Sequence, residues 1–391
     1  MVVKPKVRGY ICMTAHPKGC FENVKRQIDF VKSKPKFSVG KKVLVIGCST
    51  GYGLASRICC AFGQNAPTVG VMFEHPAKPK RTATAGWYNT AAFEEIAHQH
   101  GLYAKTVNGD AFSAEVKNKT IDIIKSDLGK VDMVVYSLAA PRRVMPDSTV
   151  VSSVLKTIGR EYSGKTIDLK SKTLKEVTIP CASEREIEDT VKVMGGGDWK
   201  DWILALKKAD AIDENAVTVA YSYVGPELTH PIYCDGTIGA AKNHLLKTAN
   251  EMTSEIEGVK AYVSVNKALV TQSSAVIPIV PLYITVLYKI MKDRGLHENC
   301  IEQMYRLFGE KFASELSFDE KGRIRIDDYE MKADVQQKVL DSLNSINDDN
   351  VDELADVKGY WQDFFEMFGF GFSNVDYDED VDIDVDVLSI N

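Results

Sequence analysis

The chain has 391 residues, 45% of them hydrophobic and 26% charged, which is typical of a globular protein with a sizeable core. Its formal net charge of −6 argues against nucleic-acid binding, which requires a basic face. The eight cysteines form no C-x-x-C pair and have no histidine at ligand spacing, so we expect reduced thiols and no metal site. The N-terminus lacks the apolar core of a signal peptide, and the most apolar stretch, 275–288, is too short to span a membrane. We therefore expect a cytoplasmic protein without stable membrane insertion.

The first forty residues are expected to be a lead-in, with a strand within 2–12 and a helix over Asn23–Lys32. Strands and helices then alternate, with strands expected at 42–47, 68–73, 102–107 and 131–137 and helices at 52–62, 89–100 and 113–127. Strands this rich in Val, Ile and Leu predict a parallel sheet covered on both faces, with ligands at the carboxyl ends of the strands. The predicted fold class is α/β, a Rossmann-type doubly wound parallel sheet.

The alternation stops between 142 and 215, which we interpret as an inserted segment covering the site. It contains short β-branched pieces at Thr166–Leu169 and Glu176–Ile179 and helical patterns at Glu184–Met194 and Asp198–Leu206. After it we expect a strand at 216–223, a helix at Thr237–Glu257, a strand at 261–266 and helices at His297–Phe308 and Tyr329–Asn344. The tail, Val375–Val387, alternates Val or Ile with acid and predicts a solvated edge strand or a frayed end.

These patterns predict one enlarged Rossmann-type domain over residues 1–391. Its parts are the lead-in at 1–40, the dinucleotide-binding core at 41–141 and 216–300, a substrate-side insertion at 142–215, and C-terminal helices and tail at 301–391.

The turn Gly47-Cys48-Ser49-Thr50-Gly51-Tyr52-Gly53 joins the apolar run Val43–Ile46 to a helical pattern. Strand, glycine turn and helix in this order open a nucleotide-binding βαβ unit, in which free N–H groups at the helix start bind phosphate. The spacing is G-x-x-x-G-x-G, not the dehydrogenase G-x-G-x-x-G, so the context must support it. We predict a tight turn at Gly47, close approach of the pyrophosphate at Gly51, and close helix–strand packing at Gly53.

The second strand ends at Glu74, where an acid would hold a ribose diol and repel a 2′-phosphate. The sequence therefore favours NADH over NADPH. Asp110-Ala111 follows the third strand and Ser137–Pro141 the fourth, and both sites suit contacts with the cofactor. Ordinary loop chemistry is the alternative for each.

Tyr233 lies before the helix at Thr237–Glu257, and Lys242 lies within it. An ammonium near a phenol lowers a pKa that is normally about 10, and it can also bind ribose hydroxyls. The phenol can donate to a carbonyl oxygen on which negative charge develops. On spacing alone, a loop tyrosine and a solvated lysine remain the simpler interpretation.

Five longer sequence motifs help to decide between these two interpretations of Tyr233 and Lys242. The motifs are Thr84–Asn89, Val193–Gly196, Tyr221-Ser222-Tyr223-Val224-Gly225-Pro226, Tyr233–Lys242 and Leu269-Val270-Thr271-Gln272. Together they resemble the trans-2-enoyl-CoA reductase family, which includes the FabV type of enoyl-acyl-carrier-protein reductase. The likeness extends from His16-Pro17-Lys18-Gly19-Cys20 to Phe368-Gly369-Phe370.

The resemblance implies an enlarged short-chain-dehydrogenase-like fold, usually monomeric, that uses NADH to reduce the 2,3 double bond of an enoyl thioester of CoA or acyl carrier protein in fatty acid synthesis. It implies that Tyr233 is the proton donor, that Lys242 is a cofactor ligand and that Tyr223 contacts the substrate. The implied cofactor contacts are Cys48, Ser49, Thr50, Gly51, Tyr52, Gly53, Phe73, Glu74, Asp110, Ala111, Leu138, Ala139, Lys242, Leu269, Val270 and Thr271. The apolar stretch Ala275–Tyr288, shaped by Pro278 and Pro281, is expected to line the acyl tunnel or to be plain core.

Two other functions remain open. One is a carbonyl reductase of the wider dehydrogenase class, which usually places Tyr and Lys three residues apart, unlike this chain. The other is a nicotinamide-binding sensor without turnover. An assay of NADH oxidation with crotonyl-CoA and with acetoacetyl-CoA separates the three.

Overall fold

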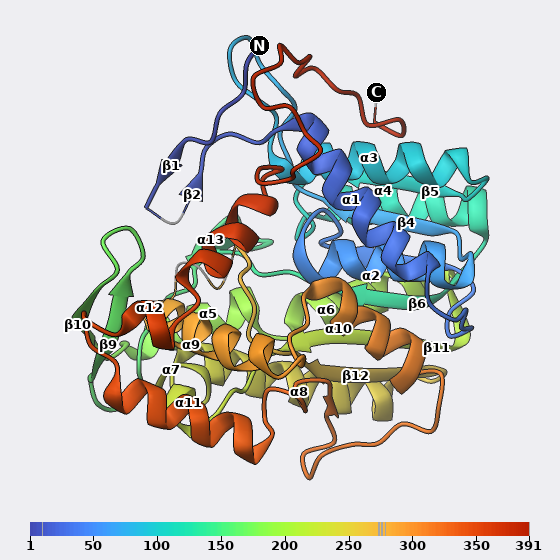
Figure 1. Ribbon diagram of the computed structural model, residues 1–391. Helices are drawn as coiled ribbons and strands as arrows, with labels where there is room; N and C mark the ends of the chain where they lie inside the picture. Colours follow the sequence, from blue (N-terminus) through green and yellow to red (C-terminus); the bar gives the residue numbers. More distant parts are fainter. Residues whose placement is uncertain (10, 273, 275–276, 278, 391) are drawn as a thin grey trace.

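A computed structural model describes residues 1–9, 11–272, 274, 277 and 279–390 of the chain. Within that part, seven parallel strands form a central sheet in the order β13-β12-β11-β6-β3-β4-β5 (Figure 1). They are β3 (Val43–Ile46), β4 (Thr68–Met72), β5 (Ala104–Asn108), β6 (Val131–Tyr136), β11 (Ile212–Ser222), β12 (Val259–Val265) and β13 (Ile324–Arg325). The chain runs outward from β3 to β5 and then returns to β6, so the strand order reverses between β3 and β6.

Alternate residues of β3 pack into two separate cores, so both faces of the sheet are covered. Val43 and Val45 belong to one core and Leu44 and Ile46 to the other, and all four are fully buried. The first face is covered by α1 (Pro17–Lys32), α2 (Gly51–Gln64), α3 (Ala85–Gln99) and α10 (Cys300–Arg306). The second is covered by α4 (Ala114–Ile123), α6 (Gly197–Lys208) and α8 (Thr237–Glu255). The predicted doubly wound α/β fold is confirmed.

The lead-in differs from the prediction at both of its elements. The expected strand within 2–12 is two short antiparallel strands, β1 (Val7–Arg8) and β2 (Ile11–Cys12), because Gly9 turns the chain with φ +61°; Tyr10 lies outside the described residues. Helix α1 begins at Pro17 rather than Asn23. Proline suits a first helical position, and the Nδ1 atom of His16 accepts a hydrogen bond from the Gly19 N–H at 3.2 Å.

The inserted segment consists of β7 (Arg142–Val144), β8 (Val150–Ser152), a hairpin of β9 (Tyr162–Asp168) and β10 (Thr173–Ile179), α5 (Glu184–Met194) and α6. The last helix of this segment, α6, was expected to cover the site, but it lies against the sheet instead. The α6 side chains of Trp199 and Trp202 are fully buried against the sheet, and their indole N–H groups donate to Thr218 Oγ1 at 2.8 Å and to the Ala111 carbonyl at 3.1 Å. Two large indoles on one helical face belong in the core, so α6 completes the second face of the sheet.

The C-terminal part adds α9 (Val280–Asp293), α11 (Ala333–Ser345), α12 (Val351–Leu354) and α13 (Val357–Glu366). Helix α9 is the apolar stretch predicted as tunnel or core, and it is buried over most of its length. Ala275, Val276 and Pro278, which belong to the same prediction, lie outside the described residues. The helices expected at 297–308 and 329–344 are found as α10 and α11 with shifted starts.

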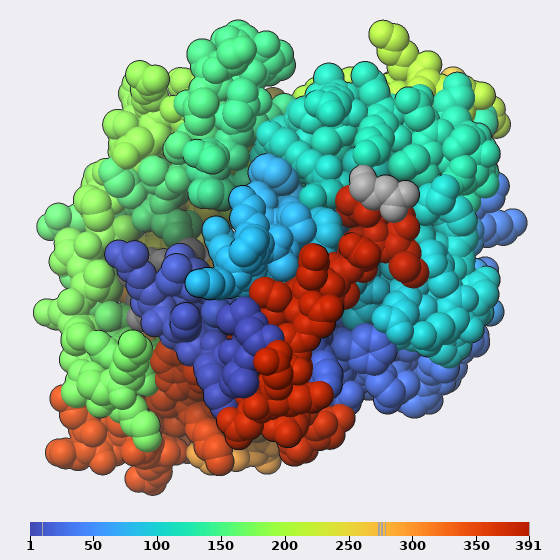
Figure 2. Space-filling view, turned by 90° about the horizontal axis from the view of Figure 1, so that it is seen from above, coloured from blue at the N-terminus to red at the C-terminus, as the bar shows by residue number. Residues whose placement is uncertain are grey.

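The tail is neither an edge strand nor a frayed end. Trp87 Nε1 donates to the Val385 carbonyl and Tyr88 Oη to the Ile383 carbonyl, each at 2.7 Å, and Val387 is buried. Figure 2 shows this red segment beside the blue N-terminal residues, where the Met1 ammonium donates to the Val381 carbonyl. None of the described helices is long and apolar enough to cross a membrane.

Candidate active site

The glycine turn lies where the strand order reverses and has the geometry its sequence predicts. Gly47 has φ +83°, a conformation that side chains disfavour, and a Cβ on it would lie 2.0 Å from the Ser137 carbonyl oxygen of the neighbouring strand end. A Cβ on Gly53 would lie 1.8 Å from the Gly47 carbonyl oxygen. The helix start and the strand end therefore touch through bare backbone, as a dinucleotide turn requires.

Gly53→Ala should weaken NADH binding by at least about tenfold and lower the unfolding free energy by about 1–3 kcal/mol, because the new methyl group must displace backbone rather than a flexible side chain. Fluorescence titration with NADH and thermal melting measure the two effects. Gly197→Ala is the matched control, since its Cβ would meet only Arg143 Nη1, at 3.9 Å. Equal behaviour of the two variants would contradict the assigned packing role of Gly53.

The residues around the turn fit a bound pyrophosphate. A cavity of about 310 Å³ is lined by Thr50, Gly51, Leu269 and Val270, among others. It lies at the N-terminus of α2, where backbone N–H groups are free for an anion, and nothing lies within 4 Å of a Cβ built on Gly51. The predicted contacts after β3 and after β12 are thus brought together at one cavity.

The side chain of Cys48 points away from this cavity. It is buried, and its sulfur accepts a hydrogen bond from Arg57 Nη1 at 3.7 Å. Any cofactor contact of Cys48 must therefore come from its backbone. Tyr52 is likewise occupied, because its hydroxyl donates to the Lys267 carbonyl at 2.8 Å.

Glu74 lies at the end of β4, as predicted, and is held in place from two sides. Ser49 Oγ donates to Glu74 Oε1 at 2.6 Å, which joins the acid to the glycine turn. Gly86, in the first turn of α3, leaves room for it: a Cβ there would lie 2.0 Å from Glu74 Oε1. The positive end of the α3 dipole favours a carboxylate at this position. The position of the Glu74 carboxylate therefore requires glycine at residue 86, which the sequence analysis did not reveal.

The remaining predicted contacts lie on the same carboxyl edge of the sheet. Phe73 is 66% exposed after β4 and offers a free aromatic face, whereas Asp110 uses its carboxylate to accept the Phe112 N–H at 2.9 Å. Ala111 is buried, and Leu138 and Ala139 follow β6 beside the glycine turn. After β12, the Val270 N–H donates to Tyr288 Oη at 3.0 Å, and Thr271 Oγ1 contacts Ser274 Oγ at 3.3 Å.

Tyr223, which is partly buried, and Tyr233, which is buried, form an aromatic pair beyond the end of β11. Tyr233 ends the short helix α7 (His230–Tyr233), and its ring meets that of Tyr223 edge to face, with centroids 4.6 Å apart. Tyr233 is 8% exposed, and in the described part of the chain its hydroxyl has no hydrogen-bond partner. That hydroxyl is free to donate to a ligand.

Lys242 is placed differently from the prediction. Its Nζ donates to the Tyr221 carbonyl at 2.9 Å and not to Tyr233, and burial lowers the pKa of Lys242 to about 8. The pKa of Tyr233 is raised, by burial and by the negative charge of Glu330. The expected lowering of the Tyr233 pKa by an ammonium is therefore wrong for this structure. Its phenol stays protonated at neutral pH, as a proton donor must.

Glu330 is a buried carboxylate at this site that the sequence patterns did not reveal. Its Oε1 accepts hydrogen bonds from the hydroxyls of Tyr223 at 2.9 Å and Tyr283 at 2.7 Å, and its Oε2 accepts the Ala268 N–H at 2.7 Å. Burial raises the pKa of Glu330, and the positive charge of Lys267, buried nearby, opposes that shift. No local motif surrounds Glu330, so only its position between β11, α9 and the end of β12 indicates its role.

Ligands of doubly wound sheets bind where the strand order reverses, and here that point carries the glycine turn, Glu74 and a cavity that Thr50 and Gly51 of the turn line. Fold and site thus define a Rossmann-type oxidoreductase class that uses a nicotinamide dinucleotide. Family models narrow the class: residues 81–312 match the trans-2-enoyl-CoA reductase catalytic region, residues 2–79 the NAD(P)H binding domain of trans-2-enoyl-CoA reductase, and residues 318–381 an enoyl reductase FAD binding domain. The chain belongs to the trans-2-enoyl-CoA reductase family.

Relatives match along nearly the whole chain. The trans-2-enoyl-CoA reductase (NADH) of Ruminiclostridium cellulolyticum is 54% identical over 374 residues, 95% of either chain. The enoyl-acyl-carrier-protein reductase (NADH) of Flavobacterium johnsoniae is 55% identical over 375 residues, with the same coverage. The crystal structure of Clostridium acetobutulicum trans-2-enoyl-CoA reductase in complex with NADH superimposes with a TM-score of 0.95 at 45% identity, over 98% of both chains. The crystal structure of Treponema denticola trans-2-enoyl-CoA reductase in complex with NAD superimposes with a TM-score of 0.94 at 46% identity, over 97% of this chain and 98% of the other.

Proposed function

We infer that this protein uses NADH to reduce the 2,3 double bond of trans-2-enoyl thioesters to the saturated acyl thioester. The substrate is an enoyl-CoA such as crotonyl-CoA or an enoyl-acyl carrier protein, and the step belongs to fatty acid synthesis. The observation that carries this inference is the Tyr223–Tyr233 pair, in which the buried phenol of Tyr233 is free to donate, at the carboxyl edge of the central sheet.

Bound NADH would supply a hydride for the β-carbon of the substrate. We propose that Tyr233 donates a hydrogen bond to the thioester oxygen as negative charge develops there, and that it provides the proton that completes the reduction. Tyr223 positions the Tyr233 ring and contacts the substrate, while its own hydroxyl is directed to Glu330. Burial of Tyr233 limits its contact with water and strengthens its hydrogen bond to the charged intermediate.

The cofactor contacts proposed for this chain follow the geometry of the turn. Backbone of Cys48–Gly53 holds the pyrophosphate, Glu74 holds the adenosine ribose, and Phe73, Asp110 and Ala111 border the adenine. Leu138, Ala139, Lys242 and Leu269–Thr271 hold the nicotinamide half. Lys242 is assigned to the ribose hydroxyls because its Nζ lies at the end of β11, 2.9 Å from the Tyr221 carbonyl.

We further propose that residues 1–391 form one enlarged domain that works as a cytoplasmic monomer. The two cores on either side of a single central sheet support one domain. Size-exclusion chromatography with light scattering measures the mass in solution, and a dimer mass would contradict the monomer.

The activity is tested by following NADH absorbance with crotonyl-CoA and with acetoacetyl-CoA. We expect NADH oxidation with the enoyl thioester only. Oxidation with the ketone would instead favour a carbonyl reductase, and NADH binding without turnover on either would favour a sensor.

Glu74→Ala should reverse the preference between the cofactors. Loss of the carboxylate removes a charge-assisted hydrogen bond to the ribose diol, so the KM for NADH should rise about tenfold or more, and loss of repulsion should lower the KM for NADPH. Steady-state kinetics with both cofactors measure the change. Glu257→Ala, at an exposed site, is the control. An unchanged ratio of NADH to NADPH efficiency would remove Glu74 from the ribose site.

A further inference from the structure

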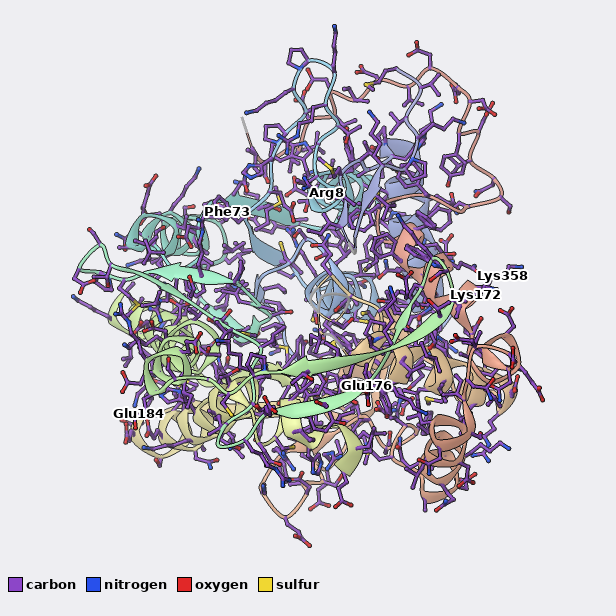
Figure 3. All side chains as sticks on the ribbon, turned by 90° about the vertical axis from the view of Figure 1, so that its left-hand side faces the viewer. Arg8, Phe73, Lys172, Glu176, Glu184 and Lys358 are labelled. Atoms are coloured by element: carbon purple, nitrogen blue, oxygen red, sulfur yellow. The ribbon has the colours of Figure 1, made fainter. Side chains whose placement is uncertain are left out.

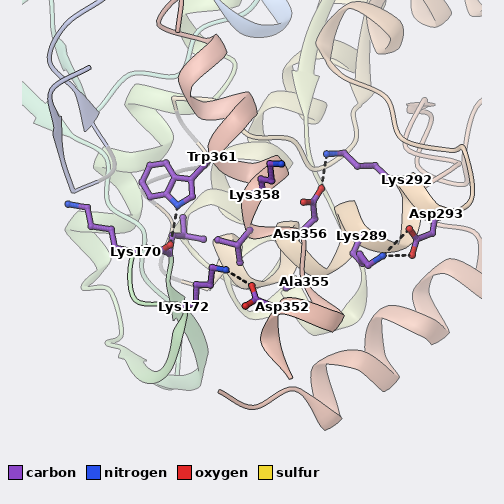
Figure 4. A pocket seen from close by; sticks show the side chains of 12 residues that line it. Lys170, Lys172, Lys289, Lys292, Asp293, Asp352, Ala355, Asp356, Lys358 and Trp361 are labelled. Carbon is purple, nitrogen blue, oxygen red and sulfur yellow. Dashed lines mark hydrogen bonds and ion pairs between the residues drawn. The ribbon is translucent and has the colours of Figure 1, made fainter. Parts of the chain in front are cut away.

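A second cavity, separate from the glycine turn, is unusually rich in lysine. It has a volume of about 750 Å³ and lies between the β9–β10 turn, the C-terminal half of α9 and the start of α13 (Figure 4). Five lysines and three aspartates line it, which leaves a formal excess of two positive charges in a chain whose net charge is −6. The lysines are Lys170, Lys172, Lys289, Lys292 and Lys358.

Three of these lysines pair with the aspartates and two do not. Lys292 lies 2.8 Å from Asp356 and Lys289 lies 2.9 Å from Asp293, and Lys172 pairs with Asp352. Lys170 and Lys358 form no ion pair with any described residue. Figure 3 shows Lys172 and Lys358 side by side at one edge of the molecule. Exposed ion pairs contribute little to the free energy of folding, so the paired lysines can also interact with a bound anion.

The cavity wall also offers apolar surface of the kind that a purine requires. Trp361 lines it, with its indole N–H already donating to the Leu169 carbonyl at 3.1 Å and its ring supported by Phe365, 5.5 Å away. A rigid indole beside several ammonium groups suits a nucleotide that carries more than one phosphate. The volume falls within the range of small-molecule sites.

The same two helices connect this cavity to the catalytic tyrosines. Helix α9 carries Tyr283, which donates to Glu330, and Lys292 lies about 14 Å further along its axis. Helix α13 carries Tyr360 immediately before Trp361, and Tyr360 is one of the groups that raise the pKa of Tyr233. The cavity and the surroundings of the tyrosine pair therefore share two helices.

We propose that this lysine-lined cavity binds the nucleotide end of coenzyme A, with the ammonium groups of Lys170 and Lys358 contacting its 3′-phosphate and diphosphate. The proposal rests on the proposed reduction of enoyl thioesters and selects CoA as the carrier. Acyl carrier protein bears a phosphopantetheine arm but no 3′-phosphoadenosine, so it would leave the cavity unfilled.

The test compares wild-type protein with the double variant Lys170→Ala/Lys358→Ala on crotonyl-CoA and on crotonyl-pantetheine, which lacks the nucleotide. Both lysines are unpaired, so their removal breaks no ion pair. We expect the KM for crotonyl-CoA to rise about tenfold or more with kcat unchanged, and the kinetics on crotonyl-pantetheine to be the same for both proteins. Lys119→Ala/Lys260→Ala, which removes two exposed lysines of the sheet region, is the matched control.

Calorimetry with adenosine 3′,5′-bisphosphate tests the cavity without turnover. We expect binding to wild-type protein, competition with crotonyl-CoA but not with NADH, and loss of binding in the double variant. An unchanged KM for crotonyl-CoA in the double variant, an equal rise of the KM for crotonyl-pantetheine, or no binding of adenosine 3′,5′-bisphosphate to wild-type protein would each overturn the proposal. Failure of the proposed function would look different, because wild-type protein would then show no NADH oxidation with either crotonyl-CoA or crotonyl-pantetheine.

Discussion

Tyr233→Phe should lower the rate of crotonyl-CoA reduction by about two to four orders of magnitude while NADH binding is retained. The substitution removes the one hydroxyl of the tyrosine pair that is free to donate, since Tyr223 is committed to Glu330. No described residue hydrogen-bonds to the Tyr233 hydroxyl, so the fold should lose no stability. Single-turnover kinetics after mixing with NADH and crotonyl-CoA measure the chemical step.

Tyr262→Phe makes the same chemical change on β12, where the ring stacks on Phe318, and it should leave turnover intact. Turnover by the Tyr233 variant at the wild-type rate would remove this residue from the mechanism. A parallel loss of NADH affinity would show instead that Tyr233 acts through the cofactor site.

Glu330→Ala should lower the free energy of unfolding by about 3–5 kcal/mol, the largest stability effect expected for a single side chain of the site. Without this fully buried carboxylate, the hydroxyls of Tyr223 and Tyr283 and the Ala268 N–H lose their acceptor. Glu330→Gln keeps an acceptor oxygen and should lose less. Denaturant unfolding of the two variants measures the difference.

The effect of Glu330 should also reach the substrate site, because the carboxylate fixes the Tyr223 hydroxyl. We expect the KM for crotonyl-CoA to rise in Glu330→Gln, with NADH affinity unchanged. Glu257→Ala, at an exposed position, should alter neither stability nor KM. Wild-type stability of Glu330→Ala would contradict the buried network.

Local patterns were sufficient for the nucleotide half of the protein. The turn from Gly47 to Gly53 was found because its constraints, positive φ and contact through bare backbone, exclude almost every other residue type. The proposal that Glu74 holds the ribose rests on an acid at the end of the second strand, and the structure joins this acid to the glycine turn through Ser49. The alternation of strands and helices followed from the β-branched runs, and the strands of the central sheet are parallel, as predicted.

Features that depend on distant parts of the chain escaped prediction. Glu330 and Tyr223 are joined across more than a hundred residues, and no local motif surrounds Glu330. The sequence predicted that helix α6 covers the site. In the structure its two tryptophans are buried in the core on the second face of the sheet. The sequence did not reveal that the acidic tail is held in place, because the side chains that donate hydrogen bonds to it, Trp87 and Tyr88, lie far away in the sequence on α3.

The amino-acid order alone therefore specified the fold class and the glycine turn, because each depends on neighbours within one turn or one strand. The proposed roles of Tyr223, Tyr233 and Lys242 came from the family resemblance and not from local spacing. The protonation of Tyr233 and the partner of Lys242 were settled only by folding. A pKa responds to burial and to every charge nearby in space, and those surroundings come from helices and strands that are far apart along the chain.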